Sequence, residues 1–176
     1  MPFRFKQTKT VQTIAQLLLH ADGSDDYLRI VKLLYIASRR CIKEAAYPIV
    51  GGPVVAMKHG PVSIDLTTLR MNSNLERQGH KIYLIADPGV GELSPFIIGI
   101  LKDTWSEYKD KGCWHVTEET RGFDEWKRHW AGEAAGSVVI PYKDIFEAVG
   151  CKNYEQAESD EQGYNAVDDL LSRTRG

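Results

Sequence analysis

The sequence predicts an α+β fold, a predominantly helical single domain with a small antiparallel β element packed on the helices. Three observations predict it. Apolar residues recur at three- and four-residue spacing over most of the chain, which is the period of an amphipathic helix. Two short β-prone runs bounded by Gly and Pro interrupt that pattern. The length of 176 residues suits one domain, and a hydrophobic fraction of 43% can supply its core.

Two helices open the chain. The first is predicted from Thr8 to a stop at Asp22-Gly23. The second is predicted to follow with Ser24 or Asp25 as its N-terminal cap, and to end before Tyr47-Pro48. Its long apolar stripe consists of Tyr27, Ile30, Val31, Leu34, Ala37, Cys41 and Ile42. A stripe of this length indicates a helix that packs along most of its length.

The β element is predicted from two runs, residues 54–57 and residues 81–86. We expect them to pair with each other, and because two strands alone are marginally stable, they must lie on helices. Between them, the sequence His59-Gly60-Pro61-Val62 predicts a turn, and Ser63 is expected to cap a further helix. The apolar positions of that helix are Ile64, Leu66 and Leu69.

The second half of the chain is predicted to be helical. Ser94-Pro95 combines a capping residue with a proline in the first turn, and Gly112 is expected to stop that helix. Shorter helices are predicted over 114–119, 124–130 and 141–149. The domain therefore spans residues 8–150. Residues 151–176 form an acidic C-terminal extension, whose weakly amphipathic segment 166–171 is expected to fold on a surface or on a partner.

Composition argues against several classes of protein. The longest apolar stretch is shorter than the roughly 20 residues of a spanning helix, and the N-terminus lacks the apolar run of a signal peptide. We therefore expect a cytoplasmic protein with no membrane partner. Cys41, Cys113 and Cys151 are odd in number and widely spaced, which indicates reduced thiols rather than a disulfide framework.

No group of residues forms a recognisable catalytic set. An exposed His59 could act as a base with a carboxylate such as Asp65, but a turn histidine bonded to the backbone is the favoured interpretation. Cys113 and His115 could bind zinc only if the fold brought further ligands, such as His80 or His129, beside them. We expect a binding protein and not an enzyme, with no cofactor and no metal.

The charges are unevenly distributed. Residues 1–60 hold nine Lys or Arg against four Asp or Glu, and the remainder holds 13 against 20. The basic side chains of the second helix lie mainly opposite its apolar stripe; they are Arg29, Lys32, Arg39, Arg40 and Lys43. Such a face could bind phosphates or an acidic protein, or be simply solvated. A nucleic-acid-binding regulator that uses the basic N-terminal half therefore stays open as an alternative function.

Several motifs occur in a characteristic order. The stretch from Lys32 to Arg40 reads Lys-Leu-Leu-Tyr-Ile-Ala-Ser-Arg-Arg, and Tyr47-Pro48-Ile49 and then Val55 to Val62 follow. Two later stretches are Asp-Glu-Trp-Lys at 124–127 and Ile-Pro-Tyr-Lys-Asp-Ile at 140–145. Over residues 8–150 this order resembles the Panacea antitoxin domain family, also called the SocA-like or phage-associated protein family.

The resemblance implies an antitoxin of a bacterial or phage-borne toxin–antitoxin system, with a role in phage defence or in a prophage. Such a protein neutralises its cognate protein toxin by direct binding. A protease or chaperone is a further candidate partner, and nucleic acid ranks below the toxin. The candidate toxin-binding residues, expected to line one groove, are Tyr35, Arg39, Arg40, His59, Gly60 and Pro61.

Overall fold

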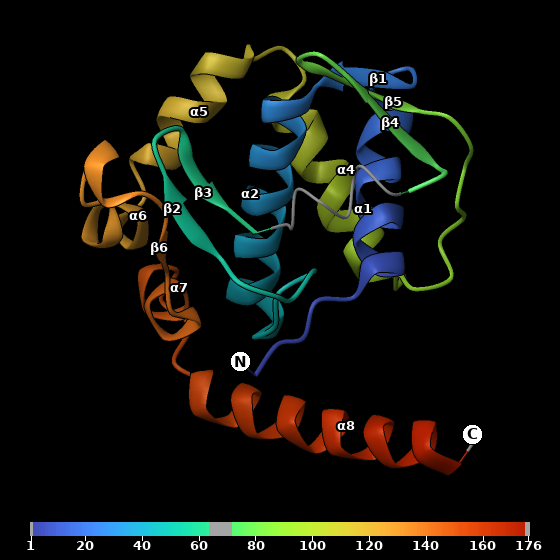
Figure 1. The fold of residues 1–176 in the computed structure, drawn as a ribbon, viewed down its shortest axis with the longest axis vertical. Coiled ribbons are helices and arrows are strands. Elements are labelled where there is room, and N and C mark those ends of the chain that lie inside the picture. Colours follow the sequence, from blue (N-terminus) through green and yellow to red (C-terminus); the bar gives the residue numbers. More distant parts are fainter. Residues whose placement is uncertain (1, 64–71, 175–176) are drawn as a thin grey trace.

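The computed structural model describes residues 2–63 and 72–174 (Figure 1). The helix predicted through Ile64, Leu66 and Leu69 lies outside them. The described helices are α1 (Gln7–His20), α2 (Tyr27–Ala45), α4 (Pro95–Tyr108), α5 (Cys113–Arg121), α6 (Asp124–His129), α7 (Tyr142–Ala148) and α8 (Tyr154–Thr174), with a 3-10 turn at Glu133–Ala135. The described strands are β1 (Ser24–Asp26), β2 (Val55–Met57), β3 (Gly60–Val62), β4 (Leu75–Gln78), β5 (Lys81–Leu84) and β6 (Val138–Val139). The predicted α+β class, mostly helical, is confirmed.

Helix α2 is the centre of the molecule. Figure 1 shows it between α1 and α4 on one side and the β2–β3 hairpin on the other. Thirteen of its 19 residues are buried, because apolar side chains at consecutive positions face neighbours all round the helix. Arg29 and Lys32 are among the buried residues. The prediction that the basic residues of this helix face away from the core is therefore wrong for these two.

The ends of α2 follow from local chemistry. The Asp26 carboxylate accepts hydrogen bonds from the backbone N–H groups of Leu28 (2.9 Å) and Arg29 (3.2 Å), which would otherwise lack partners. Ser24 and Asp25, the predicted caps, lie instead in strand β1, where their backbone pairs with β5. The helix ends before Tyr47-Pro48 as predicted.

The strands form two three-stranded antiparallel sheets, in the orders β1-β5-β4 and β3-β2-β6. The predicted pairing of residues 54–57 with 81–86 is wrong, because each run pairs with a strand close to it in sequence. Strand β2 pairs with β3 across the turn Lys58-His59, and β5 pairs with β4 across the turn Gly79-His80. The predicted turn over His59-Gly60-Pro61-Val62 is also corrected, since residues 60–62 form β3. Strand β4 was not predicted, because its residues are mainly polar and exposed.

Two hydrophobic clusters make up the core. The larger one lies mainly between α1, α2 and α4. The second cluster joins the N-terminal segment to α2, α6 and α7; Phe3 packs edge-on against Tyr142 with ring centroids 4.8 Å apart. Trp126 belongs to this cluster and donates a 2.9 Å hydrogen bond to the Met57 carbonyl of β2. The N-terminal segment and helices α6 and α7 therefore contribute to fixing α2 and the hairpin.

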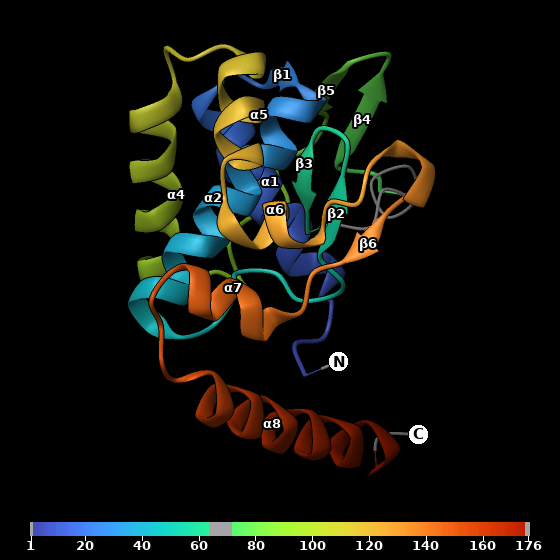
Figure 2. The same ribbon diagram turned by 90° about the vertical axis from the view of Figure 1, so that its left-hand side faces the viewer.

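Helix α8 differs from the other helices, because none of its 21 residues is buried. Figures 1 and 2 show it lying along one end of the body, with the C-terminus at its far end. It contacts α7 and the N-terminal segment.

Candidate functional site

The six predicted site residues lie in two separate places. Tyr35, Arg39 and Arg40 belong to α2, whereas residues 59–61 belong to the β2–β3 hairpin. The hairpin meets α2 at Lys32, seven residues and about 10 Å before Arg39 along the helix. Tyr35 is only 2% exposed, and Gly60 and Pro61 are also buried. The expectation that all six line one groove is therefore wrong, and only Arg39, Arg40 and His59 offer part of their side chains to solvent.

Tyr35 and Arg39 converge on a carboxylate that was not singled out from the sequence. Glu125 of α6 is fully buried and accepts hydrogen bonds from Tyr35 Oη (2.7 Å), Arg39 Nε (2.6 Å) and Arg39 Nη2 (3.1 Å). The Arg39 guanidinium also lies over the Phe123 ring, 3.7 Å from its centroid. Burial raises the pKa of Tyr35 well above its usual value, so its hydroxyl stays a donor. This cluster joins α6 to α2.

A cleft of about 350 Å³ opens beside this cluster, between α2, α4, α5 and α7. One wall carries Arg39, Arg40 and Lys43, and the opposite side carries two carboxylates and two aromatic rings. Arg40 pairs with Glu107 of α4. No carboxylate of the described residues is within ion-pair distance of Lys43. The remaining lining residues are Ile36, Tyr108, Glu119, Phe123, Ala148 and Val149.

The His-Gly-Pro-Val stretch has a packing role in the described structure. The fully buried Lys32 donates a 2.7 Å hydrogen bond from Nζ to the Pro61 carbonyl, and burial lowers the pKa of Lys32 to about 7. Gly60 has φ +92°, and a Cβ there would lie 2.5 Å from Thr120 Oγ1 of α5. The hairpin thus packs tightly between α2 and α5. In the sequence, one feature could have indicated that Lys32 is buried: it is a single lysine inside an apolar run.

The residues considered for catalysis or zinc binding take part in separate contacts. His59 packs edge-on against Trp114, a ring that is 64% exposed, and Asp65 lies outside the described residues. Cys113 donates to Asp26 Oδ1 (3.3 Å), whereas His129 Nε2 lies 2.6 Å from Asp144. Within residues 2–63 and 72–174, no three His, Cys, Asp or Glu side chains are grouped to hold a metal ion.

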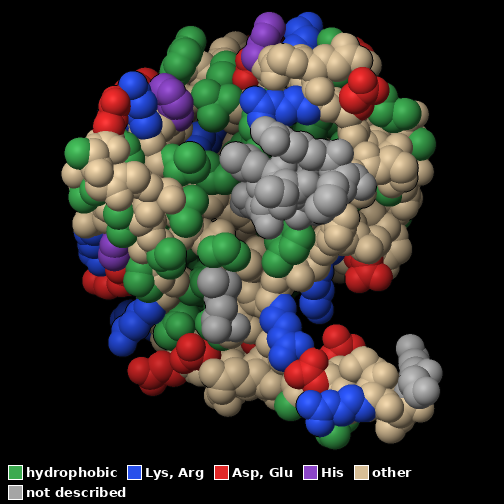
Figure 3. All heavy atoms as spheres, in the orientation of Figure 1, with side chains coloured by type: hydrophobic (Ala, Val, Ile, Leu, Met, Phe, Trp, Pro, Cys, Tyr) green, Lys and Arg blue, Asp and Glu red, His purple; other side chains and the backbone are tan. Residues whose placement is uncertain are grey.

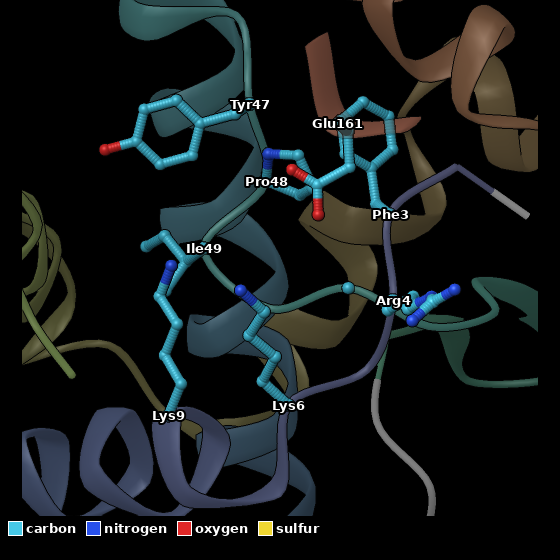
Figure 4. Close-up of a pocket in the computed structure, with 9 residues that line it drawn as sticks. Phe3, Arg4, Lys6, Lys9, Tyr47, Pro48, Ile49 and Glu161 are labelled. Atoms are coloured by element: carbon cyan, nitrogen blue, oxygen red, sulfur yellow. The ribbon is translucent and has the colours of Figure 1, made fainter. Parts of the chain in front are cut away.

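The N-terminal basic residues gather at another place. Arg4, Lys6 and Lys9 line a small cavity of about 90 Å³ beside Tyr47-Pro48, and Glu161 of α8 projects toward them (Figure 4). Burial lowers the pKa of Lys9. The acidic extension therefore lies against the most basic part of the N-terminal segment.

Part of the chain matches a known protein family. Neither the curated proteins nor the solved structures contain a match to this chain. In the part of the chain that the structure describes, none of the helices is both long and apolar enough to span a membrane. Residues 30–127 match the family described as Antitoxin SocA-like, Panacea domain. This stretch is more than half of the chain and holds most of α2, the hairpin and most of the cleft. The chain belongs to the SocA-like, Panacea domain antitoxin family.

Proposed function

We propose that this protein is a cytoplasmic antitoxin that neutralises a cognate protein toxin by direct contact, and that the cleft between α2, α4, α5 and α7 is a contact site. The observation that carries the proposal is a cleft built mostly from the family-matched stretch, with cations and aromatic rings along its walls. Arginine and aromatic side chains dominate binding hot spots, and unpaired charge steers a complementary partner. Lys43 and the partly exposed Arg40 suit an acidic toxin surface.

Co-expression tests the function. The product of the neighbouring reading frame is produced alone and together with this chain, and we expect growth arrest only when it is alone. A neighbour that is harmless, or one that is toxic in both cases, would contradict the proposal.

Binding variants test the site. We expect Arg40→Ala with Lys43→Ala to weaken toxin binding by about 2 kcal/mol or more with little change in the melting temperature. The matched control is Lys81→Ala with Lys102→Ala, which removes two exposed cations outside the cleft. If the two double variants bind the toxin with equal affinity, the cleft is not a contact site.

Binding to nucleic acid, the alternative, has weaker support in the structure. Arg29 and Lys32 are buried, Arg39 and Arg40 are paired with carboxylates, and α8 brings Glu161 to the N-terminal cations. Few cations of residues 2–60 are left to contact phosphates. A shift of the protein's own promoter DNA that disappears steeply with rising salt would favour this alternative.

A further inference from the structure

Helix α8 attaches to the body at its start through Tyr154 and Ala157, which pack against the second hydrophobic cluster, and further along through polar side chains. From Glu161 onward the half-buried residues are Glu161, Asn165 and Asp169, one on each successive turn of the same face. Asp169 accepts two hydrogen bonds from Arg4 (2.6 and 2.8 Å), and Asn165 donates to the Pro2 carbonyl (2.9 Å). Glu161 lies beside the basic cavity of the N-terminal segment (Figure 4). Beyond its first turns, this helix therefore faces the body with polar residues.

The apolar side chains in the second half of α8 are exposed. Tyr164, Val167, Leu170 and Leu171 follow one another at helical spacing and are between 52% and 73% exposed. At 100° per residue this stripe lies on roughly the opposite side of the helix from the three half-buried residues. An amphipathic helix normally buries its apolar face. In the later turns of α8 the polar face contacts the body instead, which leaves an uncovered apolar surface of a kind that marks interaction sites.

The surface beside the stripe adds a hollow. Tyr164 also lines a space of about 330 Å³ between α8 and the end of α2, together with Phe3, Ala46, Tyr47 and Ala157. A partner that covers the stripe could insert a side chain there. The stripe is thereby continuous with a recess that could hold an anchor residue.

The charge of α8 indicates which kind of partner covers the stripe. Helix α8 carries six carboxylates against one arginine. Acidic and basic side chains are both visible along the bottom of the molecule in Figure 3. Asp160 is exposed one turn before Tyr164 on the face of the stripe, and Asp168 is exposed one turn after it, at the edge between the stripe and the half-buried face. Pairing of two α8 helices would bring like charges together, which disfavours a second copy of this chain. The complementary partner has an apolar groove with Lys and Arg at its rim.

We propose that α8 is a docking helix for the toxin, whose basic-rimmed apolar groove receives Tyr164, Val167, Leu170 and Leu171. This inference rests on the proposed function and adds a second contact surface outside the family-matched stretch. It uses helix-in-groove recognition, in which apolar residues at three- and four-residue spacing serve as anchors.

The test measures the affinity of the full chain for the purified product of the neighbouring reading frame. We expect Leu170→Gln with Leu171→Gln to weaken binding about 30-fold, since two anchors are lost while glutamine keeps the helix. Leu19→Gln with Ile85→Gln is the matched control, because both residues are exposed and apolar but lie outside α8, and it should stay within about twofold of wild type. Asp160→Lys with Asp168→Lys should slow association and reduce its salt dependence.

The outcomes separate the two proposals. If the wild-type chain binds the toxin and the α8 variants bind equally well, the docking helix is refuted and the antitoxin function stands. If the wild-type chain does not bind the toxin, both the antitoxin function and the docking helix are refuted. A wild-type chain that dimerises in light scattering, with the dimer lost in the Leu170→Gln, Leu171→Gln variant, would show that a second copy occupies the stripe and would overturn the proposal.

Discussion

Replacing Arg39 by alanine tests whether the Glu125 cluster stabilises the fold. The change removes two of the three hydrogen bonds to Glu125, at 2.6 and 3.1 Å, and leaves Tyr35 as the remaining side-chain donor. Removing one partner of a buried ion pair costs about 3–5 kcal/mol. Because Arg39 itself is 19% exposed and the Tyr35 bond persists, we expect the free energy of unfolding to fall by about 2–4 kcal/mol.

Urea denaturation of the full chain measures this loss, and Arg40→Ala is the matched control. Arg40 pairs with Glu107 nearer the surface, where the side chains are 26% and 48% exposed, so its removal should cost no more than about 1 kcal/mol. A loss below about 1 kcal/mol for Arg39→Ala, or equal losses for the two variants, would refute the reasoning. Arg39 would then be a solvated residue whose role could only be in binding.

Three further predictions concern other parts of the structure. In the unfolded chain Lys32 keeps its proton up to about pH 10, whereas in the folded protein it loses the proton above about pH 7. The free energy of unfolding should therefore rise between about pH 7 and 8.5, by at most about 1.4 kcal/mol per pH unit. Denaturant midpoints should show this rise in wild type and a flatter profile in Lys32→Met. Gly60→Ala should lower the free energy of unfolding by about 2 kcal/mol or more, because the added Cβ clashes with Thr120. Gly79 also has a positive φ but lies in open space, so Gly79→Ala should lower it by about half as much in the same denaturation assay. Arg4→Ala removes the ion pair to α8, and hydrogen exchange should become faster in α8 but not in α2.

The helices could be predicted because their signals are local. Ser94-Pro95 illustrates this: the Ser94 hydroxyl accepts the Ile97 N–H at 3.2 Å, and the helix begins at Pro95. Each cap and apolar period lies within a few residues of the helix that it defines. The class of fold followed from these signals, but the partners of the strands did not, because pairing depends on the turns and on what the other elements cover.

The site residues were harder to predict because their partners are distant in sequence. Nothing near Arg39 indicates that Glu125 neutralises it, since helix spacing places arginines on a face but does not say which carboxylate covers that face. The same holds for Lys32, which resembles other basic residues of α2 until β3 and α5 enclose it. Tyr35 could be assigned either to the core or to a groove from the sequence, and the structure places it in the core.

The second hydrophobic cluster has a consequence for synthesis of the protein. Phe3 and Phe146 lie far apart in the sequence and stack with centroids 6.0 Å apart, in the same cluster as Tyr35 and Trp126. A ribosome releases Tyr35 long before its partners exist, so this cluster cannot close until Phe146 has left the exit tunnel. The family-matched stretch 30–127 lacks both Phe rings and would leave Tyr35 and Trp126 partly uncovered if it were produced alone. Nascent chains that stop within it should therefore be targets for chaperones or proteases, because this cluster is complete only after α7 has been synthesised.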